Sequence, residues 1–126
     1  MALRHNPEER LQIACVRWMQ YQWPKYAPCL QHLANGGYRT KAEASIFKAM
    51  GVRPGYPDLF LFVARGPYHG LAVELKVGTN KQTPAQVECQ DRLRDNGYQY
   101  VVIRTVEDFQ QLITSYLTDW SPTKLL

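Results

Sequence analysis

The chain has 126 residues, of which 45% are hydrophobic and 21% are charged. This length suits one compact domain and is too short for two full-sized ones, and the composition excludes a fibre or a disordered tail. Lys and Arg outnumber Asp and Glu by fifteen to eleven, giving a formal net charge of +4. That charge favours an anionic partner such as nucleic acid but does not identify one, because many basic proteins bind nothing anionic.

The three cysteines, Cys15, Cys29 and Cys89, are odd in number and far apart. This spacing argues against a disulfide framework or a zinc site and favours a reducing cytoplasm. The longest strongly apolar run, residues 59–64, is far shorter than the roughly twenty residues of a membrane helix, and the first ten residues lack the apolar stretch of a secretory signal. We therefore expect a protein that does not span a membrane and stays in the cell.

Apolar residues recur at helical spacing from Pro7 to about Tyr21 and predict the first helix. Asn6 followed by Pro7 is typical of a helix start, and Pro24 disfavours the helical conformation in the residue before it. A short strand is predicted at residues 29–34.

A second helix is predicted at residues 40–50, after an Asn-Gly-Gly turn at residues 35–37. Gly51 then ends the helix. The residues expected to face the core are Ala44, Phe47 and either Ala49 or Met50.

Two strands joined by a tight turn are predicted in the middle of the chain. Residues 59–63 form a continuous apolar run, as expected of a strand buried on both faces. Residues 65–70 contain the Gly and Pro typical of a hairpin turn, and residues 71–77 are rich in apolar and β-branched side chains. We expect these two strands to pair.

The last part of the chain predicts a helix, a strand and a helix. Thr83 is a helix cap, Pro84 suits the first helical position, and Gln86 is the third residue of a motif similar to a capping box. Residues 100–103 predict a buried strand, and residues 106 to about 117 predict a helix with one apolar face.

The order of these elements predicts the fold class. Strands that alternate with helices in this way form an α/β fold, here an α/β/α sandwich with a mixed central sheet. We expect a single domain at 1–126, with a core from about residue 7 to residue 117 and a polar C-terminal tail at 118–126.

Three ionisable residues lie against the two central strands. Asp58 stands immediately before the first strand, and Glu74 lies sixteen residues later in the second, followed by Lys76. Side chains alternate along a strand, so Glu74 and Lys76 share one face, and pairing through the turn brings Asp58 close to Glu74. The sequence therefore predicts two carboxylates and a lysine at one place.

Two adjacent carboxylates repel each other, and a hard divalent cation such as Mg²⁺ or Mn²⁺ relieves this repulsion by taking oxygen ligands from both. Such a cation activates water and polarises a phosphate, while Lys76 would stabilise the charge that develops on the phosphate. A surface salt-bridge ladder is the alternative. The apolar neighbours of Asp58 and Glu74 favour the metal site, since charges beside buried strands need partners.

Three segments form a more specific combination: Gly51-Val-Arg-Pro-Gly-Tyr-Pro-Asp58-Leu, Glu74-Leu-Lys76 and Thr83-Pro-Ala-Gln86. Together they resemble the VRR-NUC domains of the PD-(D/E)XK nucleases, and the resemblance extends from about Glu9 to Ile113. It implies an α/β/α core, a divalent metal and cleavage of DNA phosphodiester bonds. The chain looks like the standalone members found in bacteria and phages, which implies the cytoplasm of a bacterial or phage-infected cell.

The resemblance assigns roles to individual residues. Asp58 and Glu74 match the metal-binding acids, and Lys76 matches the catalytic lysine of the Glu-x-Lys motif. The backbone carbonyl of Leu75 is a further candidate metal ligand.

Two more site residues follow from the same resemblance. Gln86 matches the family glutamine, whose amide would hold a water or a phosphate oxygen beside the metal. Glu9 resembles the acid that many members contribute from the first helix, and Glu8 is a competing choice. An ordinary acid that stabilises the first turn through the helix dipole is the alternative for Glu9.

Several residues are candidates for the DNA-binding surface. Solvated surface is the alternative for each cation, and His32 and Asn35 resemble a family His-x-x-Asn pattern but equally suit structural roles. The candidates for DNA contact are Asn35, Arg39, Lys41, Arg53 and Lys81, with Lys48 nearby.

The expected function is metal-dependent cleavage of DNA by an endonuclease selective for four-way junctions or other branched DNA. Relatives imply a homodimer and a role in DNA repair. A chain of 126 residues leaves little room for a base-reading module, which disfavours a sequence-specific restriction-type enzyme. A catalytically inactive DNA-binding or assembly module is the third alternative, and the intact acids, lysine and glutamine argue against it.

Overall fold

A computed structural model describes residues 6–33 and 40–118 and shows one four-stranded sheet. In their order across the sheet, the strands are β1 (Leu30–His32), β2 (Leu59–Leu61), β3 (Leu71–Leu75) and β4 (Gln99–Ile103). The pairs β1–β2 and β2–β3 are antiparallel, whereas β3 and β4 are parallel. The predicted mixed sheet is confirmed.

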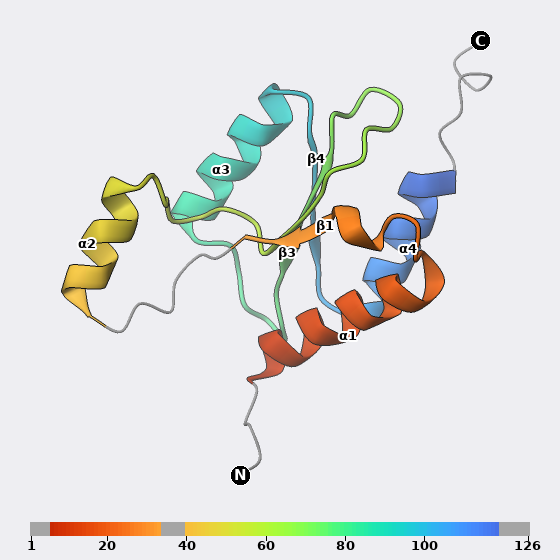
Figure 1. The fold of residues 1–126 in the computed structure, drawn as a ribbon, viewed down its shortest axis with the longest axis horizontal. Coiled ribbons are helices and arrows are strands. Elements are labelled where there is room, and N and C mark those ends of the chain that lie inside the picture. Colours follow the sequence, from red (N-terminus) through yellow and green to blue (C-terminus); the bar gives the residue numbers. More distant parts are fainter. Residues whose placement is uncertain (1–5, 34–39, 119–126) are drawn as a thin grey trace.

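Helices cover both faces of the sheet (Figure 1). The helices α1 (Pro7–Gln22) and α4 (Val106–Thr118) pack on one face. On the other face lies α3 (Pro84–Asp95), which supplies the crossover that two parallel strands require. The α/β/α sandwich expected from the order of elements is therefore confirmed.

Side-chain alternation along β3 divides the interior into two clusters. Leu71, Val73 and Leu75 point towards α1 and α4 and join the larger cluster. Ala72 points towards α3 and joins a smaller cluster with Phe60 and Tyr100. Most of the apolar core consequently lies on the α1 and α4 side of the sheet.

Both capping motifs expected from the sequence are formed. At the start of α1, the Glu9 N–H donates to Asn6 Oδ1 at 2.7 Å, and the Asn6 N–H donates to the Glu9 carboxylate at 3.3 Å. Thr83 and Gln86 make the same reciprocal pair at the start of α3, where Pro84 occupies the first turn. Local sequence thus fixes where these two helices begin.

The helix α2 (Lys41–Ala49) forms where it was predicted, with Thr40 as its N-cap, but the prediction that it faces the core is wrong. None of its residues is buried, Phe47 is 39% exposed, and Met50 at the C-cap is 74% exposed. In Figure 1 the helix projects beyond α3, away from the strands. An amphipathic pattern predicts which residues share a helix face, but not whether a neighbour covers that face.

The other boundaries differ from the predictions by a few residues. A 3₁₀ turn at Ala27–Cys29 occupies the place expected for the first residue of β1. The second strand ends at Leu61, and the prediction of burial on both faces fails for Phe62, which is 60% exposed. The expected hairpin turn forms between β2 and β3. Within the described residues, no helix is long and apolar enough to cross a membrane.

Candidate active site

Asp58 is held at the point where the chain enters β2. Leu59 pairs with Val73, so extending this antiparallel register by one residue sets Asp58 opposite Glu74, as the sequence predicted. The Leu75 N–H donates a hydrogen bond of 2.7 Å to Asp58 Oδ2. The neighbouring strand thereby anchors one carboxylate oxygen of Asp58, while Oδ1 stays outside this hydrogen bond.

Glu74 lies in β3 with no exposed surface. Its Oε1 accepts hydrogen bonds from the Tyr100 hydroxyl at 2.5 Å and from Gln82 Nε2 at 3.1 Å. Among the described residues, its Oε2 is buried without a hydrogen-bond partner, and Lys76 Nζ lies 4.0 Å away. An unsatisfied oxygen on a buried carboxylate is costly, so this atom marks a place for a cationic ligand.

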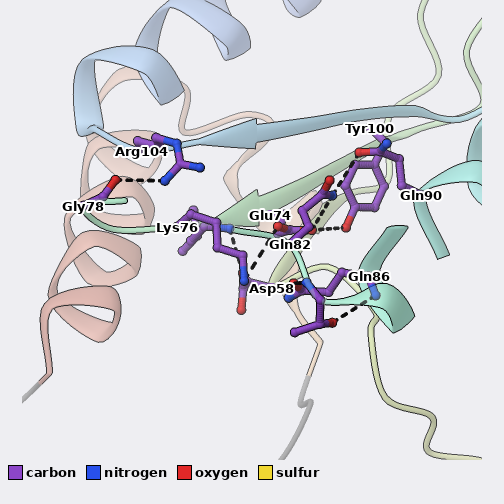
Figure 2. Close-up of polar contacts among 11 residues, drawn as sticks. Asp58, Glu74, Lys76, Gly78, Gln82, Gln86, Gln90, Tyr100 and Arg104 are labelled. Carbon is purple, nitrogen blue, oxygen red and sulfur yellow. Dashed lines mark hydrogen bonds and ion pairs between the residues drawn. The ribbon is translucent and has the colours of Figure 1, made fainter. Parts of the chain in front are cut away.

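Lys76 continues the line of β3 and is only 8% exposed. Its backbone N–H donates to the Ile103 carbonyl at 3.0 Å, which extends the parallel pairing with β4 by one residue. As Figure 2 shows, Asp58, Glu74 and Lys76 come together at one end of the sheet. Their side chains combine oxygen donors for a hard cation with a fixed positive charge.

The surroundings of Asp58 favour its neutral form. Burial raises the pKa of this carboxyl above its ordinary value, and the charge of Glu74 raises it further. The hydrogen bond from the Leu75 N–H and the positive charges of His32 and Lys76 oppose the rise. A second cation at this place would favour the ionised carboxylate.

The loop that delivers Asp58 packs tightly on the start of α3. Gly55 has φ +88°, and a Cβ on this residue would lie 2.5 Å from the carbonyl oxygen of Ala85. Only glycine allows both this backbone conformation and this approach. Two of the sequence segments singled out above, thirty residues apart, are therefore in direct contact.

A family model for the VRR-NUC domain matches residues 6–107. The chain belongs to the VRR-NUC family. A solved structure described as a VRR_NUC domain protein is 34% identical to the chain, with a TM-score of 0.77 and coverage of 91% of each chain. A second solved structure, described as a VRR_NUC domain, is 22% identical to the chain and has a TM-score of 0.57. The alignment covers 89% of this chain and 99% of the other, and this likeness shows that the two share a fold. No curated protein matches the chain.

VRR-NUC domains are nucleases, so membership of the family supports a nuclease function and implies DNA as the substrate. The match includes all three segments on which the resemblance was recognised. In this VRR-NUC chain the acids and the lysine of those segments meet at one site, as described above.

The two acids of the first helix differ in their surroundings. Glu9 is exposed, and its carboxylate accepts the hydrogen bond from the Asn6 N–H in the capping box. Glu8 is partly buried, and this burial is the largest of the causes that raise its pKa. The negative charges of Asp58 and Glu74 also raise it, whereas the positive charge of Lys76 lowers it. Glu8 therefore lies close enough to Asp58, Glu74 and Lys76 to interact with their charges, whereas the Glu9 carboxylate takes part in the helix cap.

Gln86, the candidate family glutamine, is occupied in part by a structural role. Its Oε1 accepts the Thr83 N–H at 2.8 Å within the capping box of α3. The amide nitrogen is not part of this cap. Nε2 is the donor that suits a phosphate oxygen, which only accepts hydrogen bonds.

Three polar residues around Glu74 were not anticipated from the sequence: Gln82, Gln90 and Tyr100. A signal for one of them was present, because Gln86 and Gln90 lie one helical turn apart and so share a face of α3. Tyr100 pairs with Ala72 in the parallel register, which sets its ring on the α3 side of the sheet. The sequence predicted that Tyr100 lies in a strand, but not that its hydroxyl contacts Glu74.

His32 lies beside the site and contacts backbone rather than a carboxylate. Its Nδ1 lies 2.9 Å from the carbonyl oxygen of Asp58, which also accepts the Leu33 N–H at 2.9 Å. Gln12 of α1 approaches the same ring nitrogen at 3.0 Å. These contacts give His32 a structural role that links α1, β1 and the Asp58 backbone.

The candidate DNA-binding cations lie on the surface. Lys41 and Lys48 on α2, Arg53 in the following loop and Lys81 before α3 are all exposed. Asn35 and Arg39 lie outside the described residues. The exposed positions are open to phosphate contacts.

Proposed function

We propose that this VRR-NUC protein is a Mg²⁺- or Mn²⁺-dependent endonuclease that hydrolyses phosphodiester bonds in branched DNA. The observation that carries this proposal is the buried Oε2 of Glu74, which has no hydrogen-bond partner and lies in the strand opposite Asp58. Among the residues that the structure describes, Lys76 Nζ at 4.0 Å is the cation that forms an ion pair with this oxygen. A divalent cation held by Asp58 and Glu74 would supply the missing partner.

The donor atoms suit these hard cations. Carboxylate oxygens are the ligands that Mg²⁺ and Mn²⁺ prefer, and Asp58 and Glu74 would hold the ion. Within residues 6–33 and 40–118, no group of three or more His, Cys, Asp or Glu side chains is placed to hold a metal. The remaining ligands would therefore be the backbone carbonyl of Leu75, water and phosphate, which suits an ion that keeps several waters.

Each residue of the site has a distinct task in hydrolysis. When bound, the cation lowers the pKa of a water molecule and polarises the phosphate. Lys76 stabilises the negative charge that develops on the phosphate, and its near-complete burial strengthens that interaction. Glu8 extends the acidic side of the site, and Nε2 of Gln86 orients a water or a phosphate oxygen.

A homodimer that binds branched DNA is part of the same proposal. The helix α2 has no buried residue, and its neighbouring apolar side chains Ile46 and Met50 are 59% and 74% exposed. A second copy would cover them, and a two-fold axis would place two sites on opposing strands of a symmetric junction. Light scattering should give the mass of two chains, and Ile46→Lys should reduce it to one. A monomeric wild-type protein would contradict the dimer but not the nuclease.

The proposal is tested by cleavage of a labelled panel of DNA: four-way junction, flap, splayed arm, single strand and linear duplex. Wild-type protein with Mg²⁺ or Mn²⁺ should cut the junction in preference to the duplex, and EDTA should abolish cutting. Lys76→Ala should reduce cutting by about 10²-fold to 10³-fold, the usual effect of removing a group that stabilises transition-state charge. Lys25→Ala, an exposed lysine on another part of the chain, should cut like wild type.

The other outcomes separate the alternatives. Cutting at one duplex sequence would favour a restriction-type enzyme, and binding of DNA without any cutting would favour an inactive binding module. Cleavage that persists in EDTA would contradict the metal-dependent mechanism.

A further inference from the structure

We infer that Tyr100 and Gln82 are positioning residues that orient the Glu74 carboxylate, so that Oε1 is held by the protein and Oε2 is presented to the cation. This inference rests on the proposed metal site and goes beyond it, because it assigns a task to two residues outside the family motifs. Figure 2 shows both side chains converging on Glu74 from the side of α3 and β4.

The two oxygens of Glu74 have different surroundings. Oε1 receives two hydrogen bonds, from the Tyr100 hydroxyl at 2.5 Å and from Gln82 Nε2 at 3.1 Å. Oε2 receives none and is equally excluded from water. A partial rotation of the carboxylate would lengthen both hydrogen bonds, whereas a half-turn only exchanges two equivalent oxygens, so the polar contacts hold one oxygen on the donors and leave the other facing away from them.

Gln82 is itself held in the donating orientation. Its Nε2 lies 3.1 Å from Glu74 Oε1 and 3.0 Å from Gln90 Oε1, and an amide nitrogen carries two hydrogens. Both acceptors require the nitrogen to face them, so the contacts fix which end of the amide points to Glu74. Because Gln90 belongs to α3, the helix braces the loop residue that binds the carboxylate.

Tyr100 is fixed by apolar packing. It is 2% exposed and shares the smaller buried cluster with Phe60 and Ala72. Because the ring has no room to move away, the hydroxyl stays at one place relative to Glu74. This small cluster therefore does more than stabilise the fold: it sets the position of a hydrogen-bond donor.

The consequence for metal binding is that Glu74 is ordered before the cation arrives. A hydrogen-bond partner that orients a ligand commonly changes metal affinity by about 10-fold to 100-fold when it is removed. Without the two donors, Glu74 could turn Oε1 or both oxygens towards the cation, and ordering the side chain would then cost binding free energy. Loss of Tyr100 or Gln82 should therefore weaken metal binding even in the absence of DNA.

The test is titration of the intact protein with Mn²⁺ in the absence of DNA, with free Mn²⁺ followed by electron paramagnetic resonance. Tyr100→Phe removes only the hydroxyl and should weaken Mn²⁺ binding by about 10-fold or more. Tyr116→Phe is the matched control: this buried tyrosine donates to the Val63 carbonyl at 2.6 Å on the other face of the sheet. The control should bind Mn²⁺ like wild type.

Gln82→Ala provides a second variant, at a partly buried loop residue. It should also weaken Mn²⁺ binding. Both donors act on Oε1, so their effects should not be additive. In the double variant, Tyr100→Phe with Gln82→Ala, the loss of Mn²⁺ binding free energy should be smaller than the sum of the losses in the two single variants. Thermal unfolding of each metal-free protein separates loss of metal affinity from loss of structure.

The outcomes distinguish this inference from the proposed function. If wild-type protein binds no Mn²⁺, or binds it equally after Glu74→Gln, the metal site itself is wrong. If binding depends on Glu74 but folded Tyr100→Phe and Gln82→Ala proteins bind as tightly as wild type, the metal site stands and the positioning role is overturned.

Discussion

The two sides of β3 carry different kinds of residue. Towards α1 and α4 the strand presents Leu71, Val73 and Leu75, all fully buried among apolar side chains. Towards α3 the same strand and its extension present Glu74 and Lys76, which are almost as well excluded from water. One face is closed by apolar contacts, whereas the other holds charges that need polar partners.

The difference shows how one short strand separates stability from chemistry. Burial of the apolar face removes hydrocarbon from water and stabilises the fold. Burial of Glu74 and Lys76 costs free energy, which hydrogen bonds to Oε1 and the proposed cation at Oε2 offset. Substitutions on the apolar face should mainly change the free energy of unfolding, and substitutions on the polar face should mainly change cleavage and metal binding.

The largest effect on cleavage is expected from Asp58→Asn. The amide can still accept the hydrogen bond from the Leu75 N–H, but it removes the charge that would hold the cation. We expect the cleavage rate of branched DNA to fall by about 10³-fold or more, as expected when a metal ligand is lost. Circular dichroism should show an unchanged fold. Cleavage at the wild-type rate would remove Asp58 from the site.

Ile113→Ala tests the opposite face. Ile113 has no exposed surface and packs in the larger cluster, so truncation leaves a cavity and should cost about 2–5 kcal/mol of unfolding free energy. Urea denaturation measures this loss, and Gln111→Ala, an exposed residue of α4, is the control. Cleavage assayed well below the melting temperature should remain close to wild type. A proportionate loss of cleavage would show that the two faces are coupled.

Gly55→Ala affects both properties, because it strains the loop that delivers Asp58. The substitution combines a positive φ of +88° with a clash against the Ala85 carbonyl. We expect a loss of about 2 kcal/mol in stability and, if Asp58 shifts by about 1 Å, a fall of about 10²-fold in the cleavage rate. Gly78 is the control, because it also has a positive φ, +58°, but a Cβ built on it would have no atom within 4 Å. Gly78→Ala should therefore show the effect of backbone strain alone. Equal losses in the two variants would contradict the role of the close approach.

The pH dependence of stability reports the charge on the polar face. Burial raises the pKa of Asp58 above 3.8, so the folded chain holds this proton more tightly than the unfolded chain. The resulting stabilisation is fully present below the ordinary pKa and is lost as pH rises through the raised one. In EDTA, Asp58→Asn should therefore become more stable relative to wild type as pH rises from 3.8 towards neutral. Urea unfolding across this range measures the difference, and a constant difference would contradict the raised pKa.

Much of this architecture could be predicted from the sequence, because short-range rules dominate it. The caps at Asn6 and Thr83 fixed the helix starts, and the alternation along β3 correctly predicted that Glu74 and Lys76 share a face. The exposure of α2 could not be predicted, since it depends on which element packs against the helix. The same holds for Tyr100, whose contact with Glu74 depends on the pairing of two parallel strands.

The choice between Glu8 and Glu9 shows the same limit at a single position. Both acids occupy the first turn of α1, where a negative charge stabilises the helix dipole. The capping box uses the Glu9 carboxylate, whereas Glu8 is partly buried and interacts with the charges of Asp58 and Lys76. A motif places a residue on an element, but the direction of its side chain depends on the contacts around it.

The smallest expected effect, that of Tyr116→Phe, gives the most direct comparison of the two faces. The Tyr116 hydroxyl donates to the Val63 carbonyl, so its removal leaves a buried carbonyl unpaired and should cost about 1–2 kcal/mol of unfolding free energy. In Tyr100→Phe the Glu74 oxygen keeps its bond from Gln82 but loses one that offsets its burial, so this variant should lose Mn²⁺ affinity as well as stability. Urea denaturation and Mn²⁺ titration of both variants measure the two quantities side by side. The same atom deleted from each face should thus change Mn²⁺ affinity only on the α3 face, and a similar stability loss with unchanged Mn²⁺ affinity in both variants would mean that the α3 face is only another part of the core.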